Sequence, residues 1–303
     1  MRILISGGSG LVGAAAASAL CADGHEVRRL VRPGSHSSEG GVVRWDPASG
    51  FVDVEGIEGT DVIVHLGGAG IGDARWSEAR KKVLRQSRVS STRILVDAVA
   101  RLRRKARIFL AASAVGYYGD RGDEVLSESS SNGAGFLAAL ARDWEAESLR
   151  AESAGLRVVL LRFGMILSAK GGALPSMTTP FKLGVGGRLG NGRQWVSWIA
   201  LEDVVGVIRT VLADEGLSGP VNVVSPAPVR NSEFTNTLAR VLHRPAIFPV
   251  PALALRLAFG EMANELLLAS QRAEPAKLTE RGYEFRVPDL ERTLRLSLSQ
   301  SES

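Results

Sequence analysis

The chain has few of the residues that build disulfides and metal centres. Its 303 residues include one cysteine, Cys21, and four histidines, His25, His36, His65 and His243. A single cysteine excludes an internal disulfide and a cysteine-based metal cluster, and its helical surroundings predict a small buried group. The histidines show none of the spacings at which metal ligands recur. We therefore predict no metal site.

Long apolar runs are absent as well. The segments 61–66 and 158–161 are apolar but far too short to span a bilayer. The first residues enter a strand pattern at once, without the charged and apolar regions of a signal peptide. We therefore expect a cytoplasmic protein with no membrane partner.

Positive charge is in excess, with a net charge of +5 and a pI near 9.7. Basic residues cluster at 80–88 and 101–107, a pattern that could indicate a nucleic-acid surface. Apolar positions interrupt both clusters and no aromatic residues alternate with the charges, which is typical of a solvated helix face. We predict no nucleic-acid partner.

Strand and helix patterns alternate along most of the chain. Strands are expected at 26–31, 61–66, 107–112, 156–162 and 221–224, and helices at 12–23, 76–102, 136–154 and 203–212. This order predicts an α/β fold with a Rossmann-type, doubly wound parallel sheet. Residues 1–225 would form this domain, and the proline-separated helices of 226–303 a smaller domain on the substrate side. The glycine-rich stretch within 166–200, expected to be a loop, would contribute to the pocket.

Glycines at the start of the chain carry the clearest motif. The apolar run from Ile3 to Ile5 passes directly into Gly7, Gly10 and Gly13. Such glycines allow a tight turn, a close approach to a pyrophosphate and close packing of helix on strand. The N-terminus of the following helix would face the phosphates. We therefore predict a dinucleotide site at this loop, which also contains Ser9, Leu11 and Val12.

The residue at the end of the second strand indicates which dinucleotide is bound. NAD sites present a carboxylate about 20 residues after the glycines, but this chain has Arg32 there. An arginine can pair with the 2′-phosphate of NADP, whereas a carboxylate would repel it. A simple surface arginine is the alternative. We therefore favour NADP(H) over NAD(H).

Several further motifs lie along the chain. They are His65–Ala69, Arg75–Arg80, Ser87–Arg93, Ser113–Gly119, Asp143–Glu145, Gly171–Pro175, Gly190–Trp195, Trp198–Val204 and the tail 249–283. With the Gly7–Gly13 loop, these motifs resemble the extended short-chain dehydrogenase/reductase superfamily, of the NAD-dependent epimerase/dehydratase type. Within it the chain is similar to the "epimerase family protein" subgroup, which has a C-terminal segment of unknown function.

The resemblance implies roles for individual residues. The Gly7–Gly13 loop would hold the pyrophosphate, Leu66 and Gly67 the adenosine side, and Arg88 the diphosphate region. The segment from Arg162 to Ile166 would run beside the nicotinamide. It also implies a small-molecule substrate and a homodimer formed through the long helices.

The family's catalytic residues are missing. Its members use a tyrosine and a lysine four residues later to move a proton, but residues 136–142 read Phe-Leu-Ala-Ala-Leu-Ala-Arg. The candidate replacements are Ser113 as a substrate contact and Tyr117 or its neighbour Tyr118 as a proton donor, of which we favour Tyr117. Two functions stay open: an oxidoreductase or epimerase of non-standard mechanism on a small polar or nucleotide-linked substrate, or a regulatory protein that binds NADPH without turnover.

Overall fold

The computed structural model describes residues 1–34 and 41–299, so His36 lies outside the described residues. It divides the chain into two compact units. Unit 1 comprises residues 1–113, 140–161 and 208–221, and unit 2 comprises 114–139, 162–207 and 222–303. The chain thus passes between the units several times. The division predicted at residue 225 stays a prediction.

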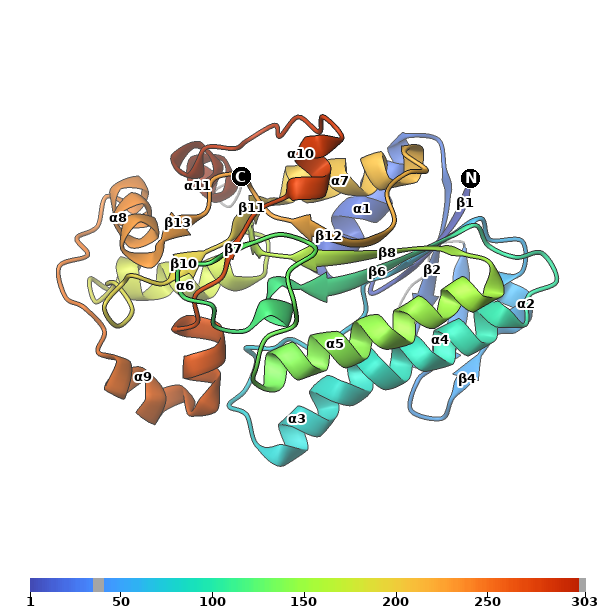
Figure 1. The fold of residues 1–303 in the computed structure, drawn as a ribbon, viewed down its shortest axis with the longest axis horizontal. Coiled ribbons are helices and arrows are strands. Elements are labelled where there is room, and N and C mark those ends of the chain that lie inside the picture. Colours follow the sequence, from blue (N-terminus) through green and yellow to red (C-terminus); the bar gives the residue numbers. More distant parts are fainter. Residues whose placement is uncertain (35–40, 300–303) are drawn as a thin grey trace. The chain divides into compact units, whose positions relative to one another are not determined.

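Eight strands form the main sheet, in the order β12-β8-β6-β5-β1-β2-β3-β4 (Figure 1). Neighbouring pairs from β3 through β2, β1 and β5 to β6 are parallel, and β4 returns antiparallel to β3. The predicted α/β class with a Rossmann-type sheet is confirmed. The strand bounds are β1 Arg2–Ser6, β2 Glu26–Val31, β3 Val42–Asp46, β4 Phe51–Val52, β5 Val62–His65, β6 Ile108–Ala114, β8 Arg157–Phe163 and β12 Gly219–Val223.

In the strand order, β1 lies at the point where the chain stops adding strands on one side and begins to add them on the other. The next strand in sequence, β2, pairs with one edge of β1, and β5 pairs with the other. Ligands of such sheets bind outside the carboxyl ends of the strands at this switch point. The glycine loop that follows Ser6 lies there.

Helices cover both faces of the sheet in unit 1 (Figure 1). On one face lies α1 (Leu11–Ala22), joined to the end of α7 (Leu201–Ala213) by an ion pair between Arg209 and Asp23 at 2.6 Å. On the other face, α3 (Glu78–Arg85), the π-helical turn η1 (Gln86–Ser90) and α4 (Ser91–Ala100) follow one another, beside α5 (Phe136–Leu149). The predicted helices at these places are confirmed.

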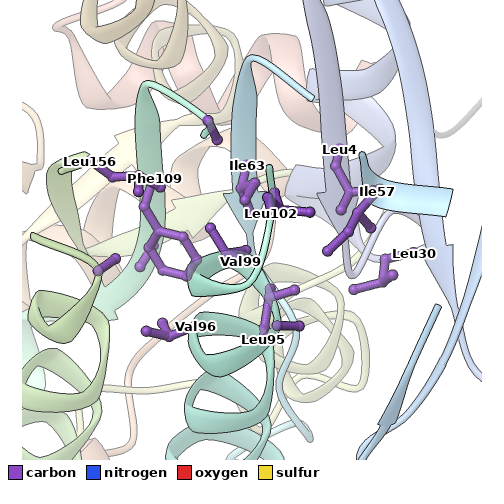
Figure 2. Close-up of a cluster of buried hydrophobic side chains, with 14 of the residues drawn as sticks. Leu4, Leu30, Ile57, Ile63, Leu95, Val96, Val99, Leu102, Phe109 and Leu156 are labelled. Atoms are coloured by element: carbon purple, nitrogen blue, oxygen red, sulfur yellow. The ribbon is translucent and has the colours of Figure 1, made fainter. Parts of the chain in front are cut away.

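The core of unit 1 fills the space between α4 and the sheet (Figure 2). Leu95 and Val99 of α4 are fully buried against Leu4, Ile63 and Phe109 of three adjacent strands. The side chains on α4 recur at the helical period while those on the strands point to one face of the sheet. This packing fixes the strand ends that carry the candidate site.

Cys21 is exposed, so the prediction that it is buried was wrong. The buried positions of α1 are Gly13, Ala16, Ala17 and Leu20, and Cys21 lies on the outer face of the helix. The sequence of α1 is apolar on all sides, so its pattern did not distinguish the two faces.

Unit 2 has small sheets surrounded by helices. Its elements are the 3-10 turn η2 (Val115–Tyr118), β7 (Val125–Leu126), β9 (Met165–Leu167), α6 (Ala173–Lys182), β10 (Trp195–Val196), β11 (Trp198–Ala200), β13 (Val229–Arg230), α8 (Asn231–Leu242), α9 (Ala252–Phe259), the π-helical turn η4 (Ala263–Leu267), β14 (Arg272–Ala273), α10 (Ala276–Glu280) and α11 (Leu290–Ser299). Its main core contains Leu174, Phe181, Trp198, Phe234 and Leu294. The remaining short elements of the chain are α2 (Val54–Ile57) and the 3-10 turn η3 (Arg150–Ala154).

Helix α6 lies inside a stretch that we expected to be a loop. Its buried residues Leu174, Thr178 and Phe181 recur at helical spacing. Glycines flank the helix, and Pro175 and Pro180 lie within it. The prolines concealed the helical period, although one in the first turn is tolerated because that position has no hydrogen-bonded amide.

No helix in residues 1–34 and 41–299 is both long and apolar enough to cross a membrane.

Candidate functional site

The glycine loop folds back on itself too tightly for any larger residue. A Cβ atom at position 13 would lie 2.2 Å from the carbonyl oxygen of Gly7. Gly7 has a φ of +71°, and a Cβ there would lie 2.9 Å from the backbone nitrogen of Gly67. Gly10 donates its N–H to the Gly7 carbonyl at 3.0 Å. The loop is thus a compact backbone surface, and it lies against the end of β5.

Helix α1 begins directly after this loop with no side chain capping its N-terminus. The first turn of the helix contains no acidic residue, while Ser9 and Gly10 are exposed and Leu11 and Val12 partly so. Uncapped amide groups at a helix N-terminus favour a phosphate through both hydrogen bonds and the helix dipole. The local structure therefore fits the pyrophosphate of a dinucleotide.

A buried polar network supports the loop from below. His65, at the end of β5, lies 2.5 Å from the Ser6 hydroxyl through Nδ1 and 3.0 Å from the Thr92 hydroxyl through Nε2. The indole of Trp144 donates to the same Thr92 oxygen at 3.0 Å. Side chains from β1, β5, α4 and α5 are thereby joined under Leu66 and Gly67. Complete burial lowers the pKa of His65 to about 4, so the imidazole is neutral near pH 7.

Arg88 lies against the loop that follows β5. Its guanidinium donates to the Ala69 carbonyl at 2.9 Å, lies next to Gly68, and stacks over the Trp144 ring at 5.2 Å. Desolvation, with a smaller contribution from the nearby Arg80, lowers the pKa of Arg88 to about 10, which leaves it charged near pH 7. The π-helical turn that carries Arg88 departs from the regular helix at this place, as such turns often do near functional sites.

Arg32 is exposed beyond the end of β2 and has no ion pair with the described residues. Its charge is therefore available to an anionic ligand. Sequence reasoning missed Arg29, whose aliphatic carbons pack 3.4 Å from the position of a Cβ on Gly8. The residue was read only as part of the β2 strand pattern.

Ser113, near the end of β6, is buried and its hydroxyl donates to the Glu145 carboxylate at 2.6 Å. Glu145 is buried on α5 and was not predicted as a site residue. The Asp143–Glu145 motif was the available signal for Glu145. A carboxylate on a mostly apolar helix needs a polar partner wherever the fold buries it.

Tyr117 and Tyr118, both in η2 of unit 2, have different surroundings. Tyr118 is buried, and its hydroxyl lies 2.7 Å from Asn222 Oδ1, 2.9 Å from the Ser127 carbonyl and 3.0 Å from Arg162 Nη1. Burial raises the pKa of Tyr118. Tyr117 is only partly buried, and its hydroxyl has no hydrogen-bond partner within residues 1–34 and 41–299.

Arg162 is a buried cation that contacts both tyrosines. Its guanidinium lies 3.6 Å from the centre of the Tyr117 ring and 5.1 Å from that of Tyr118. It also donates to the Glu128 carbonyl at 3.3 Å. Tyr117 is held at its backbone, where the carbonyl accepts hydrogen bonds from Gly133 and Asn132. The ring and the cation are thus fixed relative to each other.

The remaining predicted positions are distributed over both units. Ile166 is in β9 of unit 2, where it pairs with Ile199 of β11. The glycine loop, Leu66, Gly67, Arg32, Arg88 and Ser113 are in unit 1, and Tyr117 is in unit 2. At the start of α5, where the family's tyrosine and lysine are missing, the amides of Phe136 and Leu137 donate to Glu265 at 2.8 and 2.7 Å.

Sequence and structure comparisons give the relationship to known proteins. The model of the NAD dependent epimerase/dehydratase family matches residues 3–224, and a Domain of unknown function (DUF1731) matches residues 250–296. Epimerase family protein Mb2239 of Mycobacterium bovis is 45% identical over 283 residues, which cover 93% of each chain.

Two solved structures are similar over nearly the whole chain. Human epimerase family protein SDR39U1 (isoform 2), crystallised with NADPH, has a TM-score of 0.87 and 30% identity, with 99% of both chains covered. The UDP-glucose 4-epimerase of Thermus thermophilus, in complex with NAD, has a TM-score of 0.77 at 18% identity, covering 100% of this chain and 99% of the other, and shows the fold alone. The chain therefore belongs to the NAD dependent epimerase/dehydratase family and ends in a domain of unknown function.

Proposed function

We propose that this protein binds NADPH and uses it to reduce a carbonyl group of a small polar or nucleotide-linked substrate, with Tyr117 as the proton donor. The observation that carries the proposal is the glycine loop of unit 1. Any Cβ at position 13 would collide with the Gly7 carbonyl, and the helix behind the loop is uncapped. A loop built this tightly at the switch point of the sheet is suited to a dinucleotide.

The predicted site residues would give each part of the dinucleotide a partner. The amides of Ser9 to Gly13 would hold the pyrophosphate, and Leu66 and Gly67 the adenosine side. Arg32 would pair with the 2′-phosphate, which NAD lacks. Arg88 would add positive charge near the diphosphate, and Ile166 would lie beside the nicotinamide. When bound, the cofactor supplies the hydride. The human relative crystallised with NADPH supports this choice.

Tyr117 is suited to give up a proton because its hydroxyl is not engaged by the described protein. The guanidinium of Arg162, stacked on its ring, stabilises the negative charge that forms when the proton leaves. Arg162 thus does for this phenol what the lysine does in relatives that retain the tyrosine–lysine pair. Tyr118 is excluded as the donor because its hydroxyl is engaged by Asn222, Ser127 and Arg162.

Ser113 is proposed as a substrate contact. Its proton is directed to Glu145, so the oxygen lone pairs remain for a donor on the substrate, such as a hydroxyl group. Glu145 fixes the hydroxyl rotor of Ser113 and is therefore a positioning residue. A substrate that carries a hydroxyl beside its carbonyl group fits this arrangement.

A regulatory protein that binds NADPH without turnover is the second candidate. One observation favours it. The start of α5, which provides the acid–base pair elsewhere in the family, has leucine and alanine side chains, and its amides are capped by Glu265. On this alternative the Tyr117–Arg162 pair would be structural.

A substrate screen separates the two functions. The protein is incubated with NADPH and a panel of aldehydes, ketones and keto sugars, and cofactor oxidation is followed by absorbance. We expect turnover with a subset of hydroxylated carbonyl compounds, and its loss in Tyr117→Phe. Tight NADPH binding with no oxidation by any compound would contradict the reductase and support the regulatory protein.

A further inference from the structure

Unit 2 contains a cluster of arginines around Trp195, which the proposed chemistry does not use. Arg230 and Arg272 both stack on the ring of Trp195, with their guanidinium carbons 4.1 and 4.6 Å from the ring centre. Arg193 is close enough to lower the pKa of Asp123 together with Arg230. Three cations therefore share one small region of the unit.

The carboxylates of this region do not balance that charge. Asp123 pairs with Arg230 at 2.6 Å and accepts a hydrogen bond from the Trp195 indole at 3.0 Å. Glu124 pairs with Arg121, and Asp120 accepts from the amides of Ser270 and Gly122. The arginines of this region, Arg121, Arg193, Arg230 and Arg272, thus exceed the carboxylates Asp120, Asp123 and Glu124 by one positive charge.

Arg193 and Arg272 both lack an ion pair with the described residues, and Arg272 is the more buried of the two. The side chain is half-buried and forms no hydrogen bond or ion pair with the described residues, and its Nε atom is sealed from solvent without a partner. Removing a charged donor from water without a hydrogen-bond acceptor is unfavourable. The terminal Nη atoms are not sealed, so an anion from solution can reach them.

The surrounding structure holds Arg272 and Trp195 in place. The strand β14 that carries Arg272 pairs with β7, and the Ser197 hydroxyl links the Gln271 carbonyl to the Ala273 amide. Gln271 also donates to the Gly119 carbonyl at 3.0 Å. The Trp195 amide donates to the Ser270 hydroxyl at 3.0 Å. The cationic side chains are therefore arranged before any ligand arrives.

From this arrangement we infer an oxyanion site: Arg272, one of two arginines stacked on Trp195, binds a phosphoryl or carboxylate group of a small molecule. A guanidinium with two accessible nitrogens fits the paired oxygens of either group. The excess of positive charge attracts an anion to this region. The site lies wholly in unit 2 and does not depend on the dinucleotide or on turnover.

Calorimetric titration of the full chain with inorganic phosphate, pyrophosphate and malonate tests the inference at constant ionic strength. We expect saturable binding that is weakened about tenfold or more in Arg272→Gln, since a charge-assisted hydrogen bond is worth about 1.5–3 kcal/mol. Arg244→Gln, an exposed arginine of the same unit, is the matched control and should bind as the unmodified chain does. Arg32→Ala should also retain this binding, which separates the site from the dinucleotide loop.

The three probes distinguish the sources of the oxyanion. Tighter binding of phosphate or pyrophosphate identifies a phosphoryl ligand, and tighter binding of malonate identifies a carboxylate ligand. Either result, if lost in Arg272→Gln, supports the site. Absence of binding by the unmodified chain, or an equal loss in Arg244→Gln, would overturn it.

A chemical measurement on the unmodified chain tests the site even if the variant does not fold. Phenylglyoxal modifies accessible arginines, and peptide mass spectrometry locates the products. We expect the preferred oxyanion to protect Arg272 several-fold while Arg244 is modified equally with and without it. Equal modification of Arg272 under both conditions would refute the site.

Discussion

The glycine loop of unit 1 and the tyrosine–arginine cluster of unit 2 are built by different means. The loop is made of backbone: its shape depends on glycines at positions 7, 10 and 13, and its contacts are amides and a helix end. The cluster is made of side chains: a buried guanidinium, two phenols and an amide that meet from distant parts of the chain. On the proposed function, the backbone loop would bind the cofactor and the side-chain cluster would serve the reaction.

On the proposed function, this difference explains how the chain could keep one site and change the other. Side chains at Gly7 and Gly13 would collide with backbone, so no nearby residue can compensate. In the cluster, a cation beside a phenol can come from any nearby element, and the guanidinium over Tyr117 comes from β8. Four predictions can break or sharpen the comparison.

The largest effect is expected from the two adjacent tyrosines. Tyr117→Phe should lower turnover by about 10²- to 10⁴-fold, the usual contribution of a general acid, without a change in thermal stability. Tyr118→Phe should instead lower the free energy of unfolding by about 1–3 kcal/mol, because Asn222 and Arg162 lose a buried partner, with turnover largely kept. Steady-state kinetics and thermal melts of both variants check this. The reverse pattern would make Tyr118 the reacting group.

Gly13→Val should weaken NADPH binding by about 100-fold, because the loop must move away from the added side chain and its amides then lose charge-assisted contacts to the pyrophosphate worth about 3 kcal/mol. Gly72→Ala is the matched control, since a Cβ at Gly72 meets nothing within 4 Å. Fluorescence titration of NADPH measures both affinities, and circular dichroism checks the fold. An unchanged affinity in Gly13→Val would show that the loop is only a turn.

The network under the loop predicts a pH dependence of stability. The pKa of His65 is about 4 in the folded chain and near 6.5 when unfolded, so the unfolded state binds more protons between these values. Stability is fully present above pH 6.5 and falls below it, by at most about 1.4 kcal/mol per pH unit, or about 2 kcal/mol at pH 5. Denaturant titrations at several pH values should show this slope in the unmodified chain.

Two variants show whether His65 causes the slope of stability against pH. His65→Gln should flatten the profile, while His25→Gln, which changes a half-buried histidine outside this network, should keep it. A slope that survives in His65→Gln would mean that other groups cause it.

The sequence allowed the fold of unit 1 to be predicted because its signals are local. The glycine spacing, the apolar strands and the period of α4 all lie within short windows. The cluster of unit 2 was predicted only at its two tyrosines and in the segment that begins at Arg162. Its other members, Asn222 and Glu128, are brought together by the fold from positions about 100 residues apart. Helix α6 was missed because its prolines conceal an otherwise helical pattern of buried residues.

The smallest effect concerns the choice of cofactor. Arg32→Ala should weaken NADPH binding about tenfold, the value of one charge-assisted contact, and leave NADH binding unchanged. Parallel titrations of the two cofactors measure the ratio. Equal losses for both would mean that Arg32 acts on the adenosine in general and does not recognise the 2′-phosphate.

Transfer of deuterium tests the central claim most directly. The protein is given NADPH that is deuterated at the transferring position of C4, with the carbonyl compounds that it accepts, and the product is analysed by mass spectrometry. The account predicts deuterium on the former carbonyl carbon, formed by the unmodified chain and by Tyr118→Phe but not by Tyr117→Phe. Tight NADPH binding with no deuterium in any product would contradict it.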